Sequence, residues 1–270
     1  MIDRGKRNLL GVNVDVIDYE GALARILDAA KNREPLAVTA TAVHGLMEGA
    51  TDDEHRYRLN QLELVVPDGQ PVRWALNLFY DAELSDRVYG PDLMLQTCEL
   101  AADNDLGVYL LGGTDDLLAK LSDRLAARFP GLDLVRARPS KFRTLDAAEK
   151  QELIDDINAS GASVLCVGLG CPRQEIWAYE FKDHINMPVL AVGAAFNFHA
   201  GELDQAPPVL QRYGLEWAYR LAKEPARLWR RYLILNPYYL GLLAAQRAGL
   251  MKRRFDPASA VKPTSEILYG

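Results

Sequence analysis

Hydrophobic and polar positions divide the chain into two kinds of segment. Short runs rich in β-branched residues alternate with longer runs in which apolar positions recur at the helical period. In segment 115–129 the apolar positions fall on one helix face, Thr114 or Asp115 can cap the start, and Pro130-Gly131 ends it. The pattern predicts strands over 9–16, 36–41, 62–66, 107–111, 132–137, 163–168 and 189–192, and helices over 19–31, 70–78, 91–103, 115–129, 146–159 and 172–184.

Two of the predicted strands are apolar throughout their centres, at positions 164–167 and 189–192. Strands without polar alternation are typical of a mostly parallel sheet that helices cover on both faces. The sequence therefore predicts an α/β, Rossmann-like fold with an α-helical C-terminal part. The last residues, from Pro257 on, are expected to be frayed.

The composition is that of an ordinary globular protein, with 49% hydrophobic and 25% charged residues in 270 positions. The three cysteines are scattered, which argues against a disulfide framework and favours a reducing compartment. The first residues contain no secretory apolar region. The longest apolar run near the end, 232–245, is interrupted by Asn236-Pro237, so we expect no membrane-spanning segment.

Charge is unevenly distributed along the chain. Segment 212–254 contains ten Lys or Arg and two Glu, together with several Trp and Tyr, whereas the body before it is acidic. Such a segment suits a membrane surface or a phosphate group, because basic and aromatic side chains favour an anionic interface. It equally suits a terminal helix that docks on the core with a solvated basic face. Nucleic acid is a weaker alternative, since the acidic body would repel a long phosphate backbone.

Ligands of open α/β sheets bind beyond the carboxyl ends of the strands, so the strand-to-helix junctions are where chemistry is expected. The first junction offers the hydroxyls of Thr39 and Thr41 to a phosphate or sugar, although both can equally satisfy backbone groups. His44 follows, and a capping or half-buried histidine is favoured there over a general base. The second junction places Asp68 at the mouth of a strand, where it can accept a proton or, alternatively, open the next helix.

Glycines mark two further junctions. Gly112-Gly113 lets backbone N–H groups approach a phosphate at a helix start. The fourth junction combines two glycines with a proline at a first helical position and a following Arg-Gln-Glu, which can hold a diphosphate and read a sugar or base. Its candidate substrate-binding residues are Gly168, Gly170, Pro172, Arg173, Gln174 and Glu175. Cys171 is a poor candidate nucleophile because no histidine lies near it in sequence.

The fifth junction places Asn197 between two phenylalanines, a combination that suits a nucleoside or sugar pocket. Arg73 and Arg87 are further candidates for binding phosphate, each also compatible with a surface ion pair. The glycines match neither the dinucleotide nor the Walker pattern, and the His, Cys and Asp spacings match no metal site. Taken from the residues alone, the chain is a nucleotide-utilising α/β protein with a basic C-terminal part.

Five motifs occur in a distinctive order, at 67–69, 87–93, 167–175, 192–201 and 215–232. Their residues and order resemble those of the WecG/TagA/CpsF glycosyltransferases, glycosyltransferase family 26, over about residues 8–250. The resemblance implies an inverting enzyme that needs neither metal nor cofactor. It would move a hexose (N-acetylmannosamine, its uronic acid or another hexose) from a UDP-sugar to a sugar on a polyprenyl diphosphate, in bacterial cell-surface polysaccharide or teichoic acid synthesis.

The resemblance also implies roles for individual residues. Asp68 matches the general base of the family, Thr39 its Thr-x-Asn threonine, and Gln174 a glutamine associated with the active site. The arginines of the C-terminal part would close the site and meet the acceptor diphosphate at the membrane, and their matching positions are Arg220, Arg227, Arg230 and Arg231. We accordingly expect a catalytic domain over 1–210, a membrane-associating appendage over 211–256 and a tail over 257–270, with the protein peripheral on the cytoplasmic face of the membrane.

Two residues depart from the family pattern. Thr41 stands where the family has asparagine, and Asn197 stands where it often has aspartate. Both changes affect the donor pocket, so the sequence leaves the sugar open. It also leaves open a non-catalytic UDP-sugar-binding or assembly protein, and a homo-oligomer. A nicotinamide-dependent oxidoreductase is disfavoured because the first strand is not followed by the glycines that such an enzyme requires.

Overall fold

The computed structural model describes the backbone of residues 1–270 and the side chains of all except Arg227 and Arg231. Six parallel strands form a central sheet in the order β4-β3-β8-β7-β5-β6. The predicted α/β fold with a mostly parallel sheet is therefore confirmed. The strands are β3 (Leu36–Thr41), β4 (Leu64–Pro67), β5 (Val108–Gly112), β6 (Leu134–Arg138), β7 (Val164–Gly168) and β8 (Pro188–Ala191).

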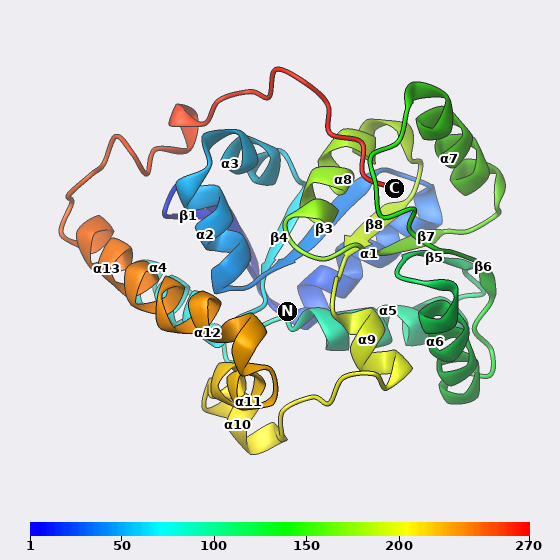
Figure 1. The fold of residues 1–270 in the computed structure, drawn as a ribbon, viewed down its shortest axis with the longest axis horizontal. Helices are drawn as coiled ribbons and strands as arrows, with labels where there is room; N and C mark the ends of the chain where they lie inside the picture. Colours follow the sequence, from blue (N-terminus) through cyan, green and yellow to red (C-terminus); the bar gives the residue numbers. More distant parts are fainter.

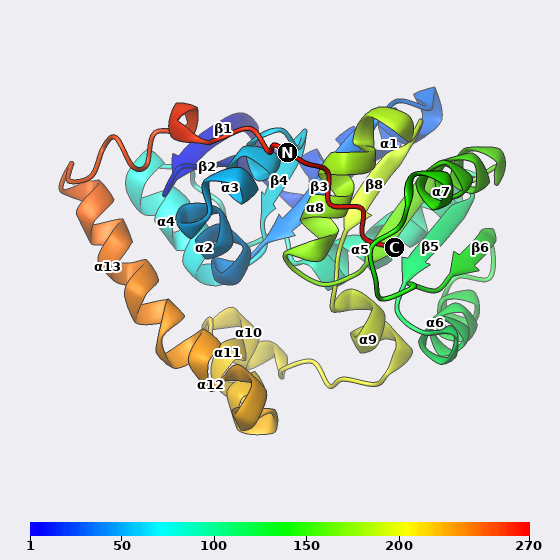
Figure 2. The ribbon, with the colours of Figure 1, turned by 45° about the horizontal axis from the view of Figure 1, so that its top comes forward.

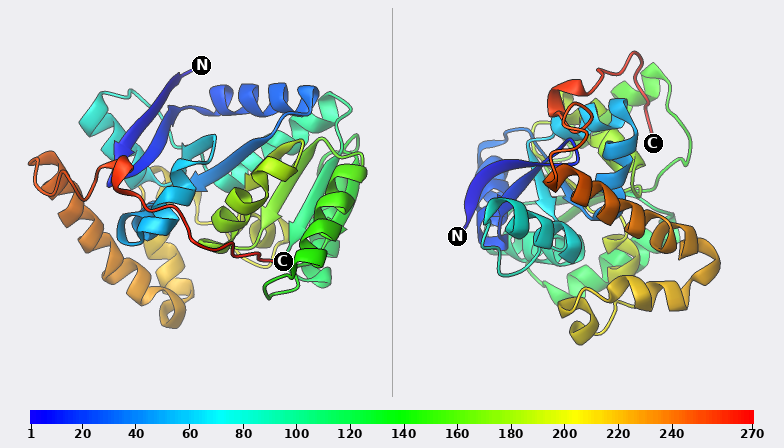
Figure 3. Two further views of the ribbon diagram at one scale, coloured as in Figure 1. Left: turned by 90° about the horizontal axis from the view of Figure 1, so that it is seen from above. Right: turned by 90° about the vertical axis from the view of Figure 1, so that its left-hand side faces the viewer.

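Helices cover both faces of this sheet (Figure 3). Strand β7 is apolar on both faces. Its residues Val164 and Cys166 belong to a buried apolar cluster on one face of the sheet, and Leu165 and Val167 belong to a second cluster on the other face. The first cluster includes α1 (Tyr19–Asn32), α5 (Gly90–Asp103), α6 (Asp115–Arg128) and α9 (Ala195–Ala200). The second includes α2 (Val43–Thr51), α3 (Asp53–Asn60), α4 (Gln70–Tyr80), α7 (Ala147–Ala159) and α8 (Arg173–Phe181), which η1 (Lys182–His184) extends.

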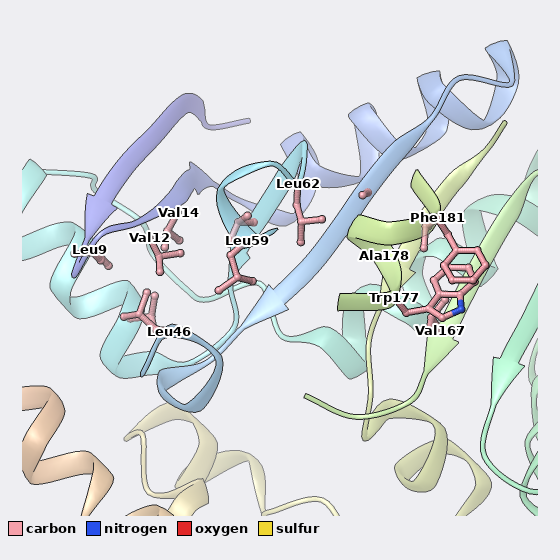
Figure 4. Close-up of a cluster of buried hydrophobic side chains, with 14 of the residues drawn as sticks. Leu9, Val12, Val14, Leu46, Leu59, Leu62, Val167, Trp177, Ala178 and Phe181 are labelled. Atoms are coloured by element: carbon pink, nitrogen blue, oxygen red, sulfur yellow. The ribbon is translucent and has the colours of Figure 1, made fainter. Parts of the chain in front are cut away.

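Figure 4 shows part of the second cluster, where the rings of Trp177 and Phe181 stack with their centroids 4.3 Å apart. The expected start of α6 is also present, since the Thr114 side chain accepts a hydrogen bond from the Leu117 amide at 3.2 Å. The sequence pattern does not predict α2, α3 and α9. In α3 the buried face carries His55, Arg56 and Arg58, so no apolar period is visible there.

The N-terminal segment differs from its prediction. The single strand expected over 9–16 is instead an antiparallel hairpin of β1 (Asp3–Leu9) and β2 (Val12–Ile17), separate from the parallel sheet. Leu10 and Gly11 form its turn with φ of 54° and 90°. A glycine in this left-handed region permits a tight reversal that a continuous strand cannot make.

The C-terminal part is helical, as expected. It contains α10 (Pro208–Arg212), α11 (Glu216–Lys223), α12 (Pro225–Leu233) and α13 (Leu235–Arg247), which run along one side of the body (Figures 1 and 2). Helix α13 is held to the body by hydrogen bonds, from the Tyr239 hydroxyl to the Pro71 carbonyl at 3.0 Å and from the Leu10 amide to the Gln246 side chain at 3.0 Å. None of the helices described is long and apolar enough to cross a membrane.

The final residues are not frayed, and that expectation was wrong. After η2 (Pro257–Ser259) the chain crosses the body past α3 and α8 (Figure 1). Its end pairs with the loop before α7 through a bridge between Thr144 and Tyr269. The Leu145 amide donates to the Leu268 carbonyl and the Gly270 amide to the Arg143 carbonyl, and nothing in the sequence pattern predicts this pairing.

Candidate active site

The carboxyl ends of the parallel strands meet at one edge of the sheet, and a cavity of about 550 Å³ opens there. Residues from all five junctions line it, including Ala42 after β3, Asp68 after β4, Gly113 after β5, Gly170 after β7 and Asn197 in α9 after β8. The expectation that these junctions share one site therefore agrees with the geometry. The concave site is lined by both polar and apolar groups, as ligand pockets commonly are.

Asp68 lies directly after β4, and its position is fixed from both sides. Its amide donates to the Thr41 carbonyl at 3.1 Å, and its carboxylate accepts from the Gly90 amide at the start of α5, also at 3.1 Å. Gly69, not Asp68, is the N-cap of α4, so the helix-opening alternative does not apply. Burial raises the pKa of the Asp68 carboxyl to about 6, although the nearby Arg87 opposes the rise.

Arg87 belongs to a cluster that joins the body to the C-terminal helices. Its guanidinium donates to the Glu216 carboxylate at 2.7 Å and to the Gln211 side chain at 3.2 Å, and it lies 4.0 Å from the centre of the Tyr89 ring. The Tyr89 hydroxyl donates to the other Glu216 oxygen at 3.1 Å. Glu216 thereby holds α11 against the mouth of the cavity.

The C-terminal helices also supply part of the cavity wall. Trp217, Arg220, Tyr232 and Asn236 line it, and the Arg220 guanidinium lies 5.6 Å from the centre of the Phe198 ring. Arg230 lies outside the cavity lining, with its guanidinium 5.3 Å from the Trp229 ring centre. The side chains of Arg227 and Arg231 lie outside the described residues.

A buried polar network supports the glycine loop between β7 and α8. The Gln174 side chain accepts from the Gly170 amide at 3.1 Å and donates to the Ala191 carbonyl at 3.1 Å and to Glu175 at 2.9 Å. The Thr39 hydroxyl donates to the same Glu175 oxygen at 3.1 Å. Burial also raises the pKa of Glu175. Gln174 therefore pins the loop to the neighbouring strand, and its amide is already occupied by protein groups.

The glycines that end β5 and β7 are required by close approaches. A Cβ at Gly168 would lie 2.6 Å from the Phe196 ring, and one at Gly112 would lie 2.7 Å from the Gly168 backbone. Gly112 also has φ of 124°, which side chains rarely tolerate. These positions keep β5, β7 and α9 close together under the cavity.

The structure thus sorts the predicted residues into two groups. Those that line the cavity are Asp68, Arg87, Gly113, Gly168, Gly170, Arg173, Gln174, Glu175, Asn197 and Arg220. Those that lie beneath or beside it are Thr39, Thr41, Gly112, Pro172 and Arg230. Thr39 and Thr41 are almost fully buried, and the Thr39 hydroxyl supports the site through Glu175 rather than facing the cavity.

Several lining residues were not predicted from the sequence. His44 is half-buried, as favoured there, and it also lines the cavity, with its ring 3.2 Å from Glu48. Glu216 and Tyr89 lie inside the motifs quoted above, but nothing in the pattern shows that they pair. Ser140, Phe142, Arg143, Tyr269 and Gly270 carry no recognisable signal, because only the fold brings them to the cavity. Among the side chains described, no group of three or more His, Cys, Asp or Glu could hold a metal ion.

Comparison with known proteins agrees with this geometry. The profile of the Glycosyl transferase WecG/TagA/CpsF family matches residues 7–253, almost the whole chain. The chain is also 28% identical over 220 residues to a protein of Bacillus spizizenii named N-acetylglucosaminyldiphosphoundecaprenol N-acetyl-beta-D-mannosaminyltransferase, a match that covers 81% of this chain and 82% of the relative. The resemblance inferred from the motifs is confirmed: the chain belongs to the WecG/TagA/CpsF family of glycosyltransferases.

Proposed function

We propose that this glycosyltransferase moves N-acetylmannosamine from a UDP-sugar to an N-acetylglucosamine carried on a polyprenyl diphosphate. The name of the Bacillus relative supports the transferred sugar and the acceptor, and the motif resemblance supports the UDP-sugar. The observation that carries the proposal is the position of Asp68 in the cavity, held by the Gly90 amide with its pKa raised to about 6.

Asp68 is the general base in this proposal. An acceptor hydroxyl attacks the anomeric carbon and forms the new C–O bond, while the bond from that carbon to the UDP β-phosphate oxygen breaks. The hydroxyl proton passes to the Asp68 carboxylate, and the leaving electron pair stays on UDP. A carboxyl with a pKa of about 6 is mostly ionised at neutral pH and is a stronger base than an ordinary aspartate.

The charge that develops on UDP needs donors on the other side of the anomeric carbon. The glycine loop after β7 and the exposed Arg173 guanidinium line the cavity, and Arg173 is proposed to stabilise this charge. Gln174 and Thr39 act beneath the loop, holding it in place. Arg220 of α11 lines the cavity, and its proposed role is to bind the acceptor diphosphate.

The C-terminal helices are proposed to rest on the cytoplasmic face of the membrane, where the lipid acceptor lies. They expose large apolar side chains beside basic ones, a combination that favours an anionic bilayer surface. Leu233 and Ile234 are each 57% exposed, and Leu240 is 61% exposed. Other exposed apolar residues of this part are Val209, Tyr213, Leu215, Trp229, Tyr238, Leu250 and Met251.

The test is a transfer assay with purified protein in EDTA. It offers a short prenyl-diphosphate-linked N-acetylglucosamine, a panel of UDP-sugars and mass-spectrometric detection of product. Asp68→Asn keeps the shape of the side chain and removes the base, so we expect turnover to fall by about two to four decades with UDP affinity nearly unchanged. The matched control is Asp183→Asn, on a side chain that is 83% exposed and does not line the cavity.

The outcomes separate the parts of the proposal. Product from UDP-N-acetylmannosamine that is absent in Asp68→Asn supports both the donor and the base. Product from another UDP-sugar overturns the assigned sugar alone. Wild-type turnover in Asp68→Asn overturns the role of Asp68.

A further inference from the structure

A segment beyond the family match forms part of the cavity wall. The family profile ends at residue 253, yet Tyr269 and Gly270 line the cavity. We call residues 266–270 the C-terminal strap. Figures 1 and 2 show this end of the chain crossing the body beside α8 and stopping near α7.

The approach to the strap is anchored along its length. The Val261 amide donates to the Asp53 carbonyl at 3.2 Å, and the Arg58 guanidinium donates to the Ser265 carbonyl at 3.5 Å. Lys150 of α7 pairs with Glu266 at 2.9 Å. Helix α3 therefore holds the chain that leads into the strap, and α7 holds the first residue of the strap.

The strap itself pairs with the loop between β6 and α7. The Leu145 amide donates to the Leu268 carbonyl at 2.6 Å, and the Gly270 amide donates to the Arg143 carbonyl at 3.1 Å. The Ser140 hydroxyl donates to the Gly270 carbonyl. This pairing leaves the half-buried Tyr269 ring in the cavity wall, 5.6 Å from the Arg173 guanidinium.

Tyr269 and Asp68 lie towards opposite ends of the cavity. Asp68 follows β4, whereas Arg173, the neighbour of Tyr269, follows β7, and β3 and β8 lie between these two strands. Three strand spacings of about 4.8 Å separate β4 from β7 by roughly 14 Å. A donor whose reacting carbon is at Asp68 and whose phosphates are at the glycine loop would place its nucleobase beyond that loop, beside the strap.

We propose that the Tyr269 ring is the surface on which the nucleobase of the donor stacks. This inference rests on the proposed UDP-sugar donor. An aromatic face binds any base by stacking, and Arg173 beside the ring supplies positive charge for the neighbouring phosphates. The strap thereby adds a nucleotide-binding residue from outside the part of the chain that matches the family.

The experiment measures UDP affinity by calorimetry for the full chain and its Tyr269 variants. Base stacking on an aromatic side chain makes us expect Tyr269→Ala to weaken UDP binding by about 5- to 30-fold. Tyr269→Phe keeps the ring and should stay within about threefold of wild type. Tyr269→Leu keeps apolar bulk without the ring and should resemble the alanine variant. Val261→Ala, on an exposed residue of the same tail outside the cavity, is the matched control.

Kinetics provide a second readout. The KM for the donor should rise in Tyr269→Ala while kcat at saturating donor stays close to wild type, because the ring does not touch the reacting atoms. Unchanged UDP affinity in Tyr269→Ala, or full affinity in Tyr269→Leu, would overturn the stacking role. Failure of the wild-type chain to bind UDP would instead overturn the donor assignment on which this inference depends.

Discussion

The body of the protein and its C-terminal helices bury their side chains in contrasting ways. In the body, helices on both sheet faces bury apolar stripes, and polar groups at the junctions are tied to one another. Of the side chains described in α10–α13, those of Leu228, Tyr239 and Leu242 are buried, and many large apolar ones are exposed. Residues 1–211 carry a net charge of −13, whereas 212–254 carry +8.

The contrast indicates that the body and the C-terminal helices have different roles. A rigid site suits the body, because bond rearrangement needs groups held in fixed positions. An exposed apolar and basic surface suits the helices, because it leaves binding area for something outside the chain. The two regions meet at Glu216, which binds Arg87 and Tyr89 of the body from α11. Substitution at that contact tests most directly how the body and the C-terminal helices depend on each other.

The largest effect is expected from Glu216→Ala. It removes the partner of an almost buried arginine, a loss that costs about 2–5 kcal/mol of stability when the charge is left unpaired. The charge of Glu216 also raises the pKa of Asp68, so its loss should lower that pKa. We expect a reduced melting temperature together with an acid limb of the pH–rate profile that moves to lower pH.

The control for this variant is Glu83→Ala. Glu83 pairs with Arg4 at 2.7 Å on the surface, with its side chain 72% exposed, and such pairs contribute about 0–1 kcal/mol. A Glu216→Ala variant with wild-type melting temperature and pH profile would mean that the two regions are not coupled through this cluster.

The sequence predicted the body better than the site. Alternating apolar strands and periodic helices are enough to predict a parallel sheet, and parallel strands bring their carboxyl ends to one edge whatever the loops contain. Spacing placed Asp68 at the mouth of a strand but favoured a helix-opening role, and the family resemblance made it the candidate base. Thr39 was predicted to be catalytic and Gln174 to bind substrate. Instead Thr39 is buried against Glu175 and Gln174 donates to the Ala191 carbonyl, contacts between elements that spacing cannot show. The strap was not predicted either, because it too reaches the cavity through contacts with elements far from it in sequence.

A smaller effect concerns the stability of the body itself. The Asp68 pKa is about 6 in the folded protein and about 3.9 in an unfolded chain, so the folded state binds the proton more tightly. The stabilisation that this carboxyl contributes is fully present below its pKa in the unfolded chain. It is lost as the pH rises through its folded-state pKa of about 6. Asparagine at this position stays neutral. We therefore expect the free energy of unfolding of Asp68→Asn to exceed that of wild type by about 1–3 kcal/mol at pH 8 and to match it near pH 4.

Urea unfolding at the two pH values measures this difference. Asp183→Asn serves again as the surface control, and it should show no gain at either pH. Equal stability of Asp68→Asn and wild type at pH 8 would contradict a desolvated carboxylate at the cavity. The same result would weaken the contrast between the body, whose buried groups are proposed to carry out the reaction, and the C-terminal helices, whose exposed surface is proposed to bind the membrane.

The smallest effect concerns the exposed apolar surface of the C-terminal helices. Truncation near residue 211 is a poor test, because it also deletes Glu216, Tyr239 and the strap, which contact the body. The double variant Leu233→Ser/Ile234→Ser changes two side chains that are each 57% exposed at the end of α12 and leaves the charges intact.

Partial insertion of two aliphatic side chains into a bilayer surface contributes about 1–2 kcal/mol, which corresponds to a loss of about 5- to 30-fold in partitioning. Co-sedimentation with vesicles that contain anionic lipid measures the change, and Val261→Ser, which alters an exposed residue of the tail, is the control. UDP affinity should stay unchanged in the double variant, because neither residue lines the cavity. Vesicle binding equal to wild type, in a variant that still folds, would mean that this apolar surface does not meet the membrane and that the basic residues must act alone.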